Sequence, residues 1–130
     1  MNKEELVSAV RSTAGIDTVE HGEAAIRATL RVLGQRLSGG ETKDLAAQLP
    51  PAFTDTLPAT GPGERFGVDE FYGKVAEDEG LGCSKEQARQ HARAVLAALK
   101  ASVTGGEFDD VVAQLPDEYA DLLGTGPVQH

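Results

Sequence analysis

The feature that most constrains this chain is an internal repeat with an offset of 66 residues. Residues 39–57 align with 105–123, and ten of the nineteen aligned pairs are identical. Each copy opens on Gly-Gly-Glu and reaches Gln-Leu-Pro after six further residues. Identity of that extent at one fixed offset indicates a duplicated unit of about 65 residues. We therefore divide the chain into a first repeat, 1–63, and a second repeat, 64–130.

Helical periodicity runs through both repeats, and alternating β-branched runs are absent. The first helix of each repeat is predicted over 2–14 and 68–79. The second helix begins after the N-cap residues Thr18 and Ser84. Its apolar residues recur at i, i+4, i+7 and i+11 in both copies, which predicts a long amphipathic helix in each repeat.

The third and fourth helices follow from the repeated segment itself. Ser38 and Thr104 each stand three residues before a glutamate. That is the spacing of a capping box, in which hydroxyl and carboxylate each accept from the other residue's backbone N–H. The third helix is expected to end before Pro50 or Pro116, and each proline then suits the start of a short fourth helix. Residues 58–66 form the predicted linker.

These elements predict an all-α fold: eight helices formed by two tandem four-helix repeats, packed as one compact bundle-like domain over residues 1–130. A lone repeat would have only a marginal core, so the two repeats are expected to share one. The predicted core consists of the apolar residues on the inward helix faces: Leu6, Val10, Ile26, Leu30, Leu33, Leu37, Leu45, Leu49, Phe53, Leu57, Phe71, Val75, Leu96, Leu99, Val103, Val111, Leu115, Tyr119 and Leu123.

Charge and composition narrow the classes of function. The chain has 21 acidic and 12 basic residues, a net charge of −9, which disfavours nucleic acid and anionic membrane surfaces as partners. Its single cysteine, Cys83, excludes an internal disulfide framework. No apolar run approaches the roughly 20 residues of a membrane helix, and the first residues lack the apolar stretch of a signal peptide. The expectation is an acidic cytoplasmic protein with no membrane contact.

Two segments of this acidic chain are basic. Residues 18–38 and 84–104 together hold seven basic and three acidic residues, a net charge of +4, while the remainder of the chain carries −13. One interpretation is that these are solvated helix faces with local ion pairs. The other is a basic surface for an acidic partner, or for the chain's own acidic helices. The residues expected to contact such a partner are Arg27, Arg31, Arg89 and Arg93.

The titratable residues match no catalytic or metal-binding motif. His21 and His91 occupy different repeat positions, and neither follows an acid by three residues, as a Glu-x-x-His dimetal motif requires. Together with His130 they are expected at the surface. Cys83 precedes a helix, where its pKa could fall, but its repeat equivalent is Asp17, so an isolated and partly exposed thiol is expected. The sequence therefore assigns no catalytic residue, no cofactor and no metal.

Two further repeated features are assigned to folding. The Gly-Gly pair before the third helix could bind an anion on free backbone amides, but the capping side chains would occupy those amides. Gln48 and Gln114 each precede Leu-Pro and are expected to bond carbonyls left free by the proline. A pair of glutamines facing a ligand is the alternative.

The repeated pattern resembles one protein family. The residues that carry the resemblance are Phe71, Val75 and Ala76, then Glu107 and Gln114-Leu115-Pro116, together with their equivalents in the first repeat. Over nearly the whole chain they resemble the domain of unknown function family 2267, a bacterial uncharacterised family. The resemblance implies an all-helical fold with two similar halves. It brings no established activity, cofactor or catalytic residue.

Folding explains almost every recognisable pattern, so the sequence predicts a non-catalytic interaction or scaffold domain with a protein partner. The alternative is a small-ligand-binding protein, or an enzyme, with a cleft between the two repeats. An enzyme and a homo-oligomer both stay open at this point.

Overall fold

The computed structural model describes residues 2–37, 41–56 and 65–123, which form helices and no strand. The first repeat contains α1 (Lys3–Ala14), α2 (Val19–Arg36), α3 (Glu41–Ala46) and the 3-10 helix η1 (Pro51–Thr56). The second contains α4 (Val68–Glu79), α5 (Lys85–Ser102), α6 (Gly105–Ala113), the 3-10 helix η2 (Asp117–Tyr119) and α7 (Ala120–Leu123). Within these ranges, every helix is too short or too polar to cross a membrane.

The predicted starts of the two long helices are confirmed. The Thr18 hydroxyl accepts a hydrogen bond from the His21 backbone N–H at 3.1 Å and caps α2. Ser84 forms a complete capping box with Gln87 at the start of α5, with bonds of 3.1 and 2.9 Å. These caps satisfy backbone donors that a helix leaves free at its N-terminus, which fixes where each helix begins.

The expected count of eight helices is wrong: the described residues form seven α-helices. The predicted fourth helix of the first repeat is instead the 3-10 helix η1, in which Phe53 N–H bonds the carbonyl of Pro50 at 2.9 Å. The hydroxyls of Thr54 and Thr56 donate to the carbonyls of Pro51 and Phe53 at 3.1 and 2.6 Å. Because these hydroxyls compete for carbonyls that α-helical bonds would use, the segment keeps the tighter winding.

The two Gln-Leu-Pro segments share one local structure. Gln48 and Leu49 donate from their backbone N–H groups to carbonyls three residues earlier, at 3.0 and 3.1 Å. Gln114 and Leu115 do the same at 3.1 and 3.0 Å. Each third helix therefore tightens and ends before its proline, as predicted. Superposition of the two complete repeats stays a prediction.

The side chain of Gln48 differs from its expected role. It accepts from the Thr104 backbone N–H at 2.8 Å and donates to the Thr104 hydroxyl at 3.3 Å, so it joins the end of α3 to the start of α6. The Thr104 hydroxyl also accepts from the Glu107 N–H at 3.2 Å, which confirms the predicted cap. The other predicted bond of the capping box, from the Thr104 backbone N–H to the Glu107 carboxylate, is wrong. The Gln48 side chain accepts from that N–H instead. The predicted cap at Ser38 lies outside the described residues.

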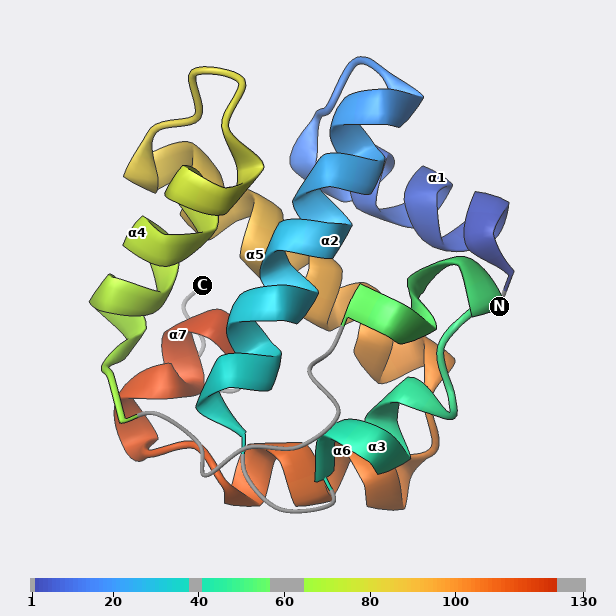
Figure 1. Ribbon diagram of the computed structural model, residues 1–130, viewed down its shortest axis with the longest axis vertical. Coiled ribbons are helices and arrows are strands. Elements are labelled where there is room, and N and C mark those ends of the chain that lie inside the picture. The colour runs from blue at the N-terminus through green and yellow to red at the C-terminus, as the bar shows by residue number, and fades with distance from the viewer. Residues whose placement is uncertain (1, 38–40, 57–64, 124–130) are drawn as a thin grey trace.

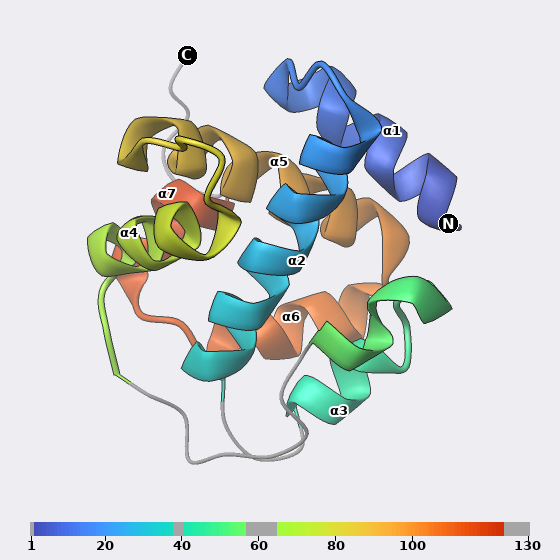
Figure 2. The same ribbon diagram turned by 45° about the horizontal axis from the view of Figure 1, so that its top comes forward.

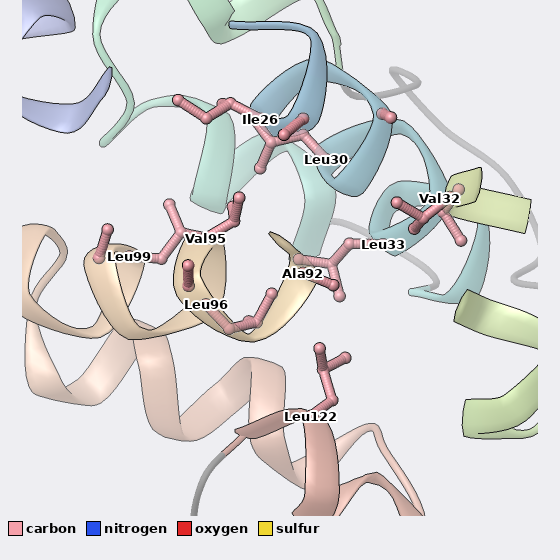
Figure 3. Packing of buried hydrophobic residues seen from close by; sticks show 14 of the residues in the cluster. Ile26, Leu30, Val32, Leu33, Ala92, Val95, Leu96, Leu99 and Leu122 are labelled. Carbon is pink, nitrogen blue, oxygen red and sulfur yellow. The ribbon is translucent and has the colours of Figure 1, made fainter. Parts of the chain in front are cut away.

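Helices α2 and α5 form the centre of the molecule. Figures 1 and 2 show α2 crossing the middle, with α5 behind it and α4 and α1 on either side; α2 packs against all three. Figure 3 shows the apolar side chains of α2 and α5 filling the space between the two helices, with Leu122 of α7 beside them. The core is therefore shared between the two repeats.

The predicted core is confirmed at every described position, and Leu57 lies outside the described residues. The predicted linker, 58–66, is wrong at its last residue, Phe66. This residue is buried, and its carbonyl accepts from the Tyr119 hydroxyl at 2.7 Å. Further core residues that the periodicity missed include Val7, Tyr72, Val95 and Leu122.

Candidate functional site

Three side chains with metal-binding donor atoms meet where α2, α4 and α5 pack together. The Nε2 atom of His21 lies 2.7 Å from Oε2 of Glu79. The Nδ1 atom of His91 lies 3.0 Å from Oε1 and 2.9 Å from Oε2 of the same carboxylate. The two imidazole rings meet edge to face, with centroids 5.3 Å apart. One donor atom from each residue lies within 4.8 Å of the others, and we call these three residues the His–Glu–His cluster.

Helix ends and one tight loop position these residues. His21 lies in the first turn of α2, three residues after the Thr18 cap. Glu79 is the last residue of α4, and Gly80, with φ of +66°, reverses the chain there in a conformation that glycine adopts without strain. Because α5 then runs back along α4, its second turn brings His91 beside Glu79. The first repeat supplies one member of the cluster and the second repeat supplies two.

The carboxylate of Glu79 is the most deeply buried member of the His–Glu–His cluster. The Glu79 side chain is 0% exposed, that of His91 is 9% exposed and that of His21 is 33% exposed. A carboxylate in such a place is costly unless it is hydrogen-bonded and paired. With neutral imidazoles, two ring N–H groups satisfy the oxygens of Glu79, but one negative charge stays buried. A cation bound among the three side chains would compensate this charge.

Cys83 follows Glu79 by four residues, in the loop between α4 and α5. Its thiol is partly buried and packs against the hydrophobic core. Burial raises the pKa of the Cys83 thiol to about 11, and the charge of Glu79 and a hydrogen bond to its carboxylate act in the same direction. The suggestion that the following helix lowers this pKa is therefore wrong. The Cys83 thiol itself donates to the Ser84 backbone carbonyl at 3.4 Å.

The prediction of surface histidines is wrong for His91, which is buried. His21 is intermediate, with one ring nitrogen turned inward to Glu79. Glu79 itself was not singled out by the sequence. Its partners lie 58 residues before it and 12 residues after it, separations that belong to no metal motif.

Three of the four arginines expected to contact a partner, Arg27, Arg31 and Arg89, have partners within the protein. The Arg27 guanidinium lies 5.0 Å from the centre of the Phe53 ring and donates to the Ala52 carbonyl at 3.2 Å. Arg31 makes a bidentate ion pair with Asp78 of α4, with both bonds at 2.8 Å. The Arg27 contacts join α2 to η1, and the Arg31–Asp78 ion pair joins α2 to α4.

Arg89 and Arg93 differ from each other. Arg89 makes a bidentate ion pair with Asp121 at 2.9 and 2.7 Å, and the Tyr72 hydroxyl donates to the same carboxylate at 2.6 Å. The Nε atom of Arg93 is buried without a hydrogen-bond partner. The four arginines therefore do not share one environment, and recruitment of an acidic partner through them stays a prediction.

The network around Asp121 is expected to make stability fall in acid. Hydrogen bonds from Arg89 lower the pKa of Asp121 to about 2, from an ordinary value of 3.8. A lowered native pKa contributes stability above the unfolded-state value, and this contribution is lost as the pH falls from about 4 to about 2. Asp121→Asn should cost on the order of 1 kcal/mol at pH 7, since the carboxylate is partly exposed and screened.

Urea denaturation at pH 7, 4 and 2 measures this effect. The difference in free energy of unfolding between Asp121→Asn and wild type should shrink toward zero at pH 2. The control is Asp117→Asn, which removes an exposed carboxylate nearby. A difference for Asp121→Asn that does not change with pH would contradict the assignment.

Comparison with known protein families places the chain in a family over nearly its whole length. The model of the family described as "Uncharacterized conserved protein (DUF2267)" matches residues 3–122, a range that contains the whole His–Glu–His cluster. No curated protein matches the chain.

Proposed function

Because the chain belongs to the uncharacterised DUF2267 family, which brings no activity with it, we propose a function from the site alone. The protein binds one divalent transition-metal ion of the zinc class through His21, Glu79 and His91. One observation carries this proposal: a fully buried carboxylate lies between two imidazoles contributed by both repeats. The proposal therefore follows the small-ligand alternative, with its site between the repeats.

The donor set favours zinc-like ions over hard cations. Imidazole nitrogen and carboxylate oxygen are ordinary zinc ligands, whereas Mg²⁺ and Ca²⁺ prefer sites made of oxygen alone. In a tetrahedral zinc site with bonds of about 2.1 Å, neighbouring ligand atoms lie about 3.4 Å apart. The donor atoms of the cluster already lie within 4.8 Å of one another. Side-chain adjustments of about 1 Å are therefore enough to bind the ion.

Zinc titration of chelator-treated protein tests the proposal. Competition with a chromophoric chelator should show one zinc ion per chain. Glu79→Gln keeps the size of the side chain but removes its charge and replaces one acceptor oxygen with an NH2 donor. It should weaken zinc binding at least about a hundredfold, since changes to groups that merely support a ligand already cost 10- to 100-fold.

Glu77→Gln is the matched control, because Glu77 is an exposed acid on the same helix, two residues earlier. It should leave zinc affinity unchanged. Equal affinities for wild type and Glu79→Gln would contradict the proposed site, as would wild-type protein that takes up no zinc.

A second function, binding of an acidic partner, is favoured by one observation at Arg93. The Arg93 side chain lines a surface hollow with Thr13, Gln90 and Leu123, between α1, α5 and α7, and its positive charge helps to lower the pKa of Asp121. A carboxylate of a partner protein that entered this hollow would be attracted by the same charge.

Fluorescence anisotropy with a labelled hexaglutamate peptide tests this second proposal. Arg93→Glu should weaken peptide binding roughly fivefold or more, because it replaces an attraction with a repulsion. Arg31→Glu is the control, since Arg31 already pairs with Asp78. Equal binding by wild type and Arg93→Glu would exclude a role for Arg93.

A further inference from the structure

We infer that a metal ion held by the His–Glu–His cluster keeps its fourth coordination position open and takes a small, singly charged anion there. The inference rests on the proposed metal binding and adds a second ligand to the same site. The class of ligand is a compact anion that binds the ion through one donor atom.

The cluster supplies one donor atom fewer than a tetrahedral ion requires. Among the described residues, the group of possible metal ligands contains His21, Glu79 and His91, and no further histidine, cysteine, aspartate or glutamate joins it. The Cys83 thiol, four residues after Glu79, donates instead to the Ser84 carbonyl at 3.4 Å. Zinc centres with three protein ligands take water or another small molecule in the fourth position.

Charge favours an anion as the fourth ligand. A divalent ion brings two positive charges, Glu79 supplies one negative charge, and neutral imidazoles supply none. The acid one residue earlier, Asp78, is already paired with Arg31 at 2.8 Å. The occupied cluster therefore has one positive charge in excess, at a place where the central carboxylate is 0% exposed. Because an uncompensated charge is costly in such a place, an anion with a single charge is preferred over a neutral or doubly charged ligand.

The open position is reached from the end of the molecule where α2 begins and α4 ends. Both segments lie at the top of Figure 1. Residues 17–20, directly before His21, and residues 80–82, directly after Glu79, are exposed. The side chain of His21 is 33% exposed, against 9% for His91. The cluster therefore lies directly beneath the surface, and the covered side chains of His91 and Glu79 limit the ligand to a few atoms.

Binding of the anion involves neither proton transfer nor a change of oxidation state. The anion displaces a solvent molecule and donates one electron pair to the metal ion. Zinc accepts nitrogen, oxygen and sulfur donors, so azide is a suitable probe for the class and acetate is its oxygen-donor counterpart.

Cobalt-substituted protein reports on the fourth position. In chelator-treated wild type loaded with one Co²⁺ per chain, azide should change the visible absorption of the metal, and the change should saturate as for a single site. Acetate should do the same, while sulfate should bind at least about tenfold more weakly, because its second charge is left uncompensated. Glu77→Gln should match the wild type in each titration. Glu79→Gln should lose the cobalt spectrum at the same metal concentration, which assigns the spectrum to the cluster.

Metal affinity gives a second readout. If azide binds only to the metal-loaded protein, it must strengthen metal binding by the same coupling. At ten times its dissociation constant, azide should raise the apparent affinity for Co²⁺ about elevenfold, after correction for azide bound to free Co²⁺. Sulfate at the same concentration should raise this affinity at most about twofold.

The outcomes separate this inference from the proposed function. If cobalt binds, and neither azide nor acetate changes its absorption or its affinity, the fourth position is closed and the inference is wrong, while metal binding by the His–Glu–His cluster still holds. Sulfate binding as tight as that of azide would overturn the preference for a single charge. If wild type binds neither cobalt nor zinc, the proposed function fails, and the anion site fails with it.

Discussion

Zinc at a hundredfold excess over its dissociation constant is expected to raise the melting temperature of the protein by about 10 °C. A ligand at that concentration, bound by the folded state alone, stabilises it by about 2.7 kcal/mol. For a chain of this size, 1 kcal/mol corresponds to roughly 3–5 °C. The reason for such a stabilisation is structural: a bound ion would join α2 to α4 and α5 through His21, Glu79 and His91 and would compensate the buried carboxylate of Glu79.

Differential scanning calorimetry with and without zinc measures this shift. Glu79→Gln should show little or no zinc-dependent shift, and Glu77→Gln should respond like the wild type. Magnesium at the same concentration should have no effect on any of the three proteins, because two imidazoles are poor ligands for it. A shift of equal size in Glu79→Gln would mean that zinc binds elsewhere.

Phe71→Ala is expected to have the largest effect on folding, a loss of about 3–5 kcal/mol. The ring is fully buried and packs edge to face against Tyr119, with centroids 5.8 Å apart, and also contacts Phe66 and Tyr72. Its removal leaves a cavity among aromatic residues of three separate segments. A small domain has only about 5–15 kcal/mol of stability in total, so the variant should lie close to unfolding at 37 °C.

Urea denaturation followed by circular dichroism measures this loss. Phe71→Leu is the control, because it keeps most of the apolar volume and should cost less than half as much. Loss of less than 1 kcal/mol in Phe71→Ala would contradict the central role of this ring.

Much of the fold could be predicted because its signals are local. The caps at Thr18 and Ser84 and the apolar spacing after them specify α2 and α5 without reference to the rest of the chain. The short fourth helix of the first repeat could not be predicted in the same way. Its 3-10 winding depends on the hydroxyls of Thr54 and Thr56, which compete with the backbone for nearby carbonyls.

The candidate site could not be predicted because its members share no sequence period. His21 meets Glu79 only after α2 packs against α4, a contact between elements far apart in the chain. The repeat also gave a misleading expectation. His21 and His91 break the repeat pattern, which counts against them as long as only repeated residues are considered. A duplicated unit, however, must keep the residues that its fold requires, and residues with another role can differ between the copies. Departures from the repeat were the available signal for these residues.

The packing of α1 has a consequence for the protein during its synthesis. The apolar stripe of α1, formed by Leu6, Val7 and Val10, is covered by α5 as well as by α2. At about 5–20 residues per second, a ribosome completes α5 about 5–20 seconds after it has completed α1. During that interval the nascent first repeat exposes a surface that the finished chain buries. Chaperone capture and aggregation therefore act on this protein most strongly before the second long helix has left the ribosome.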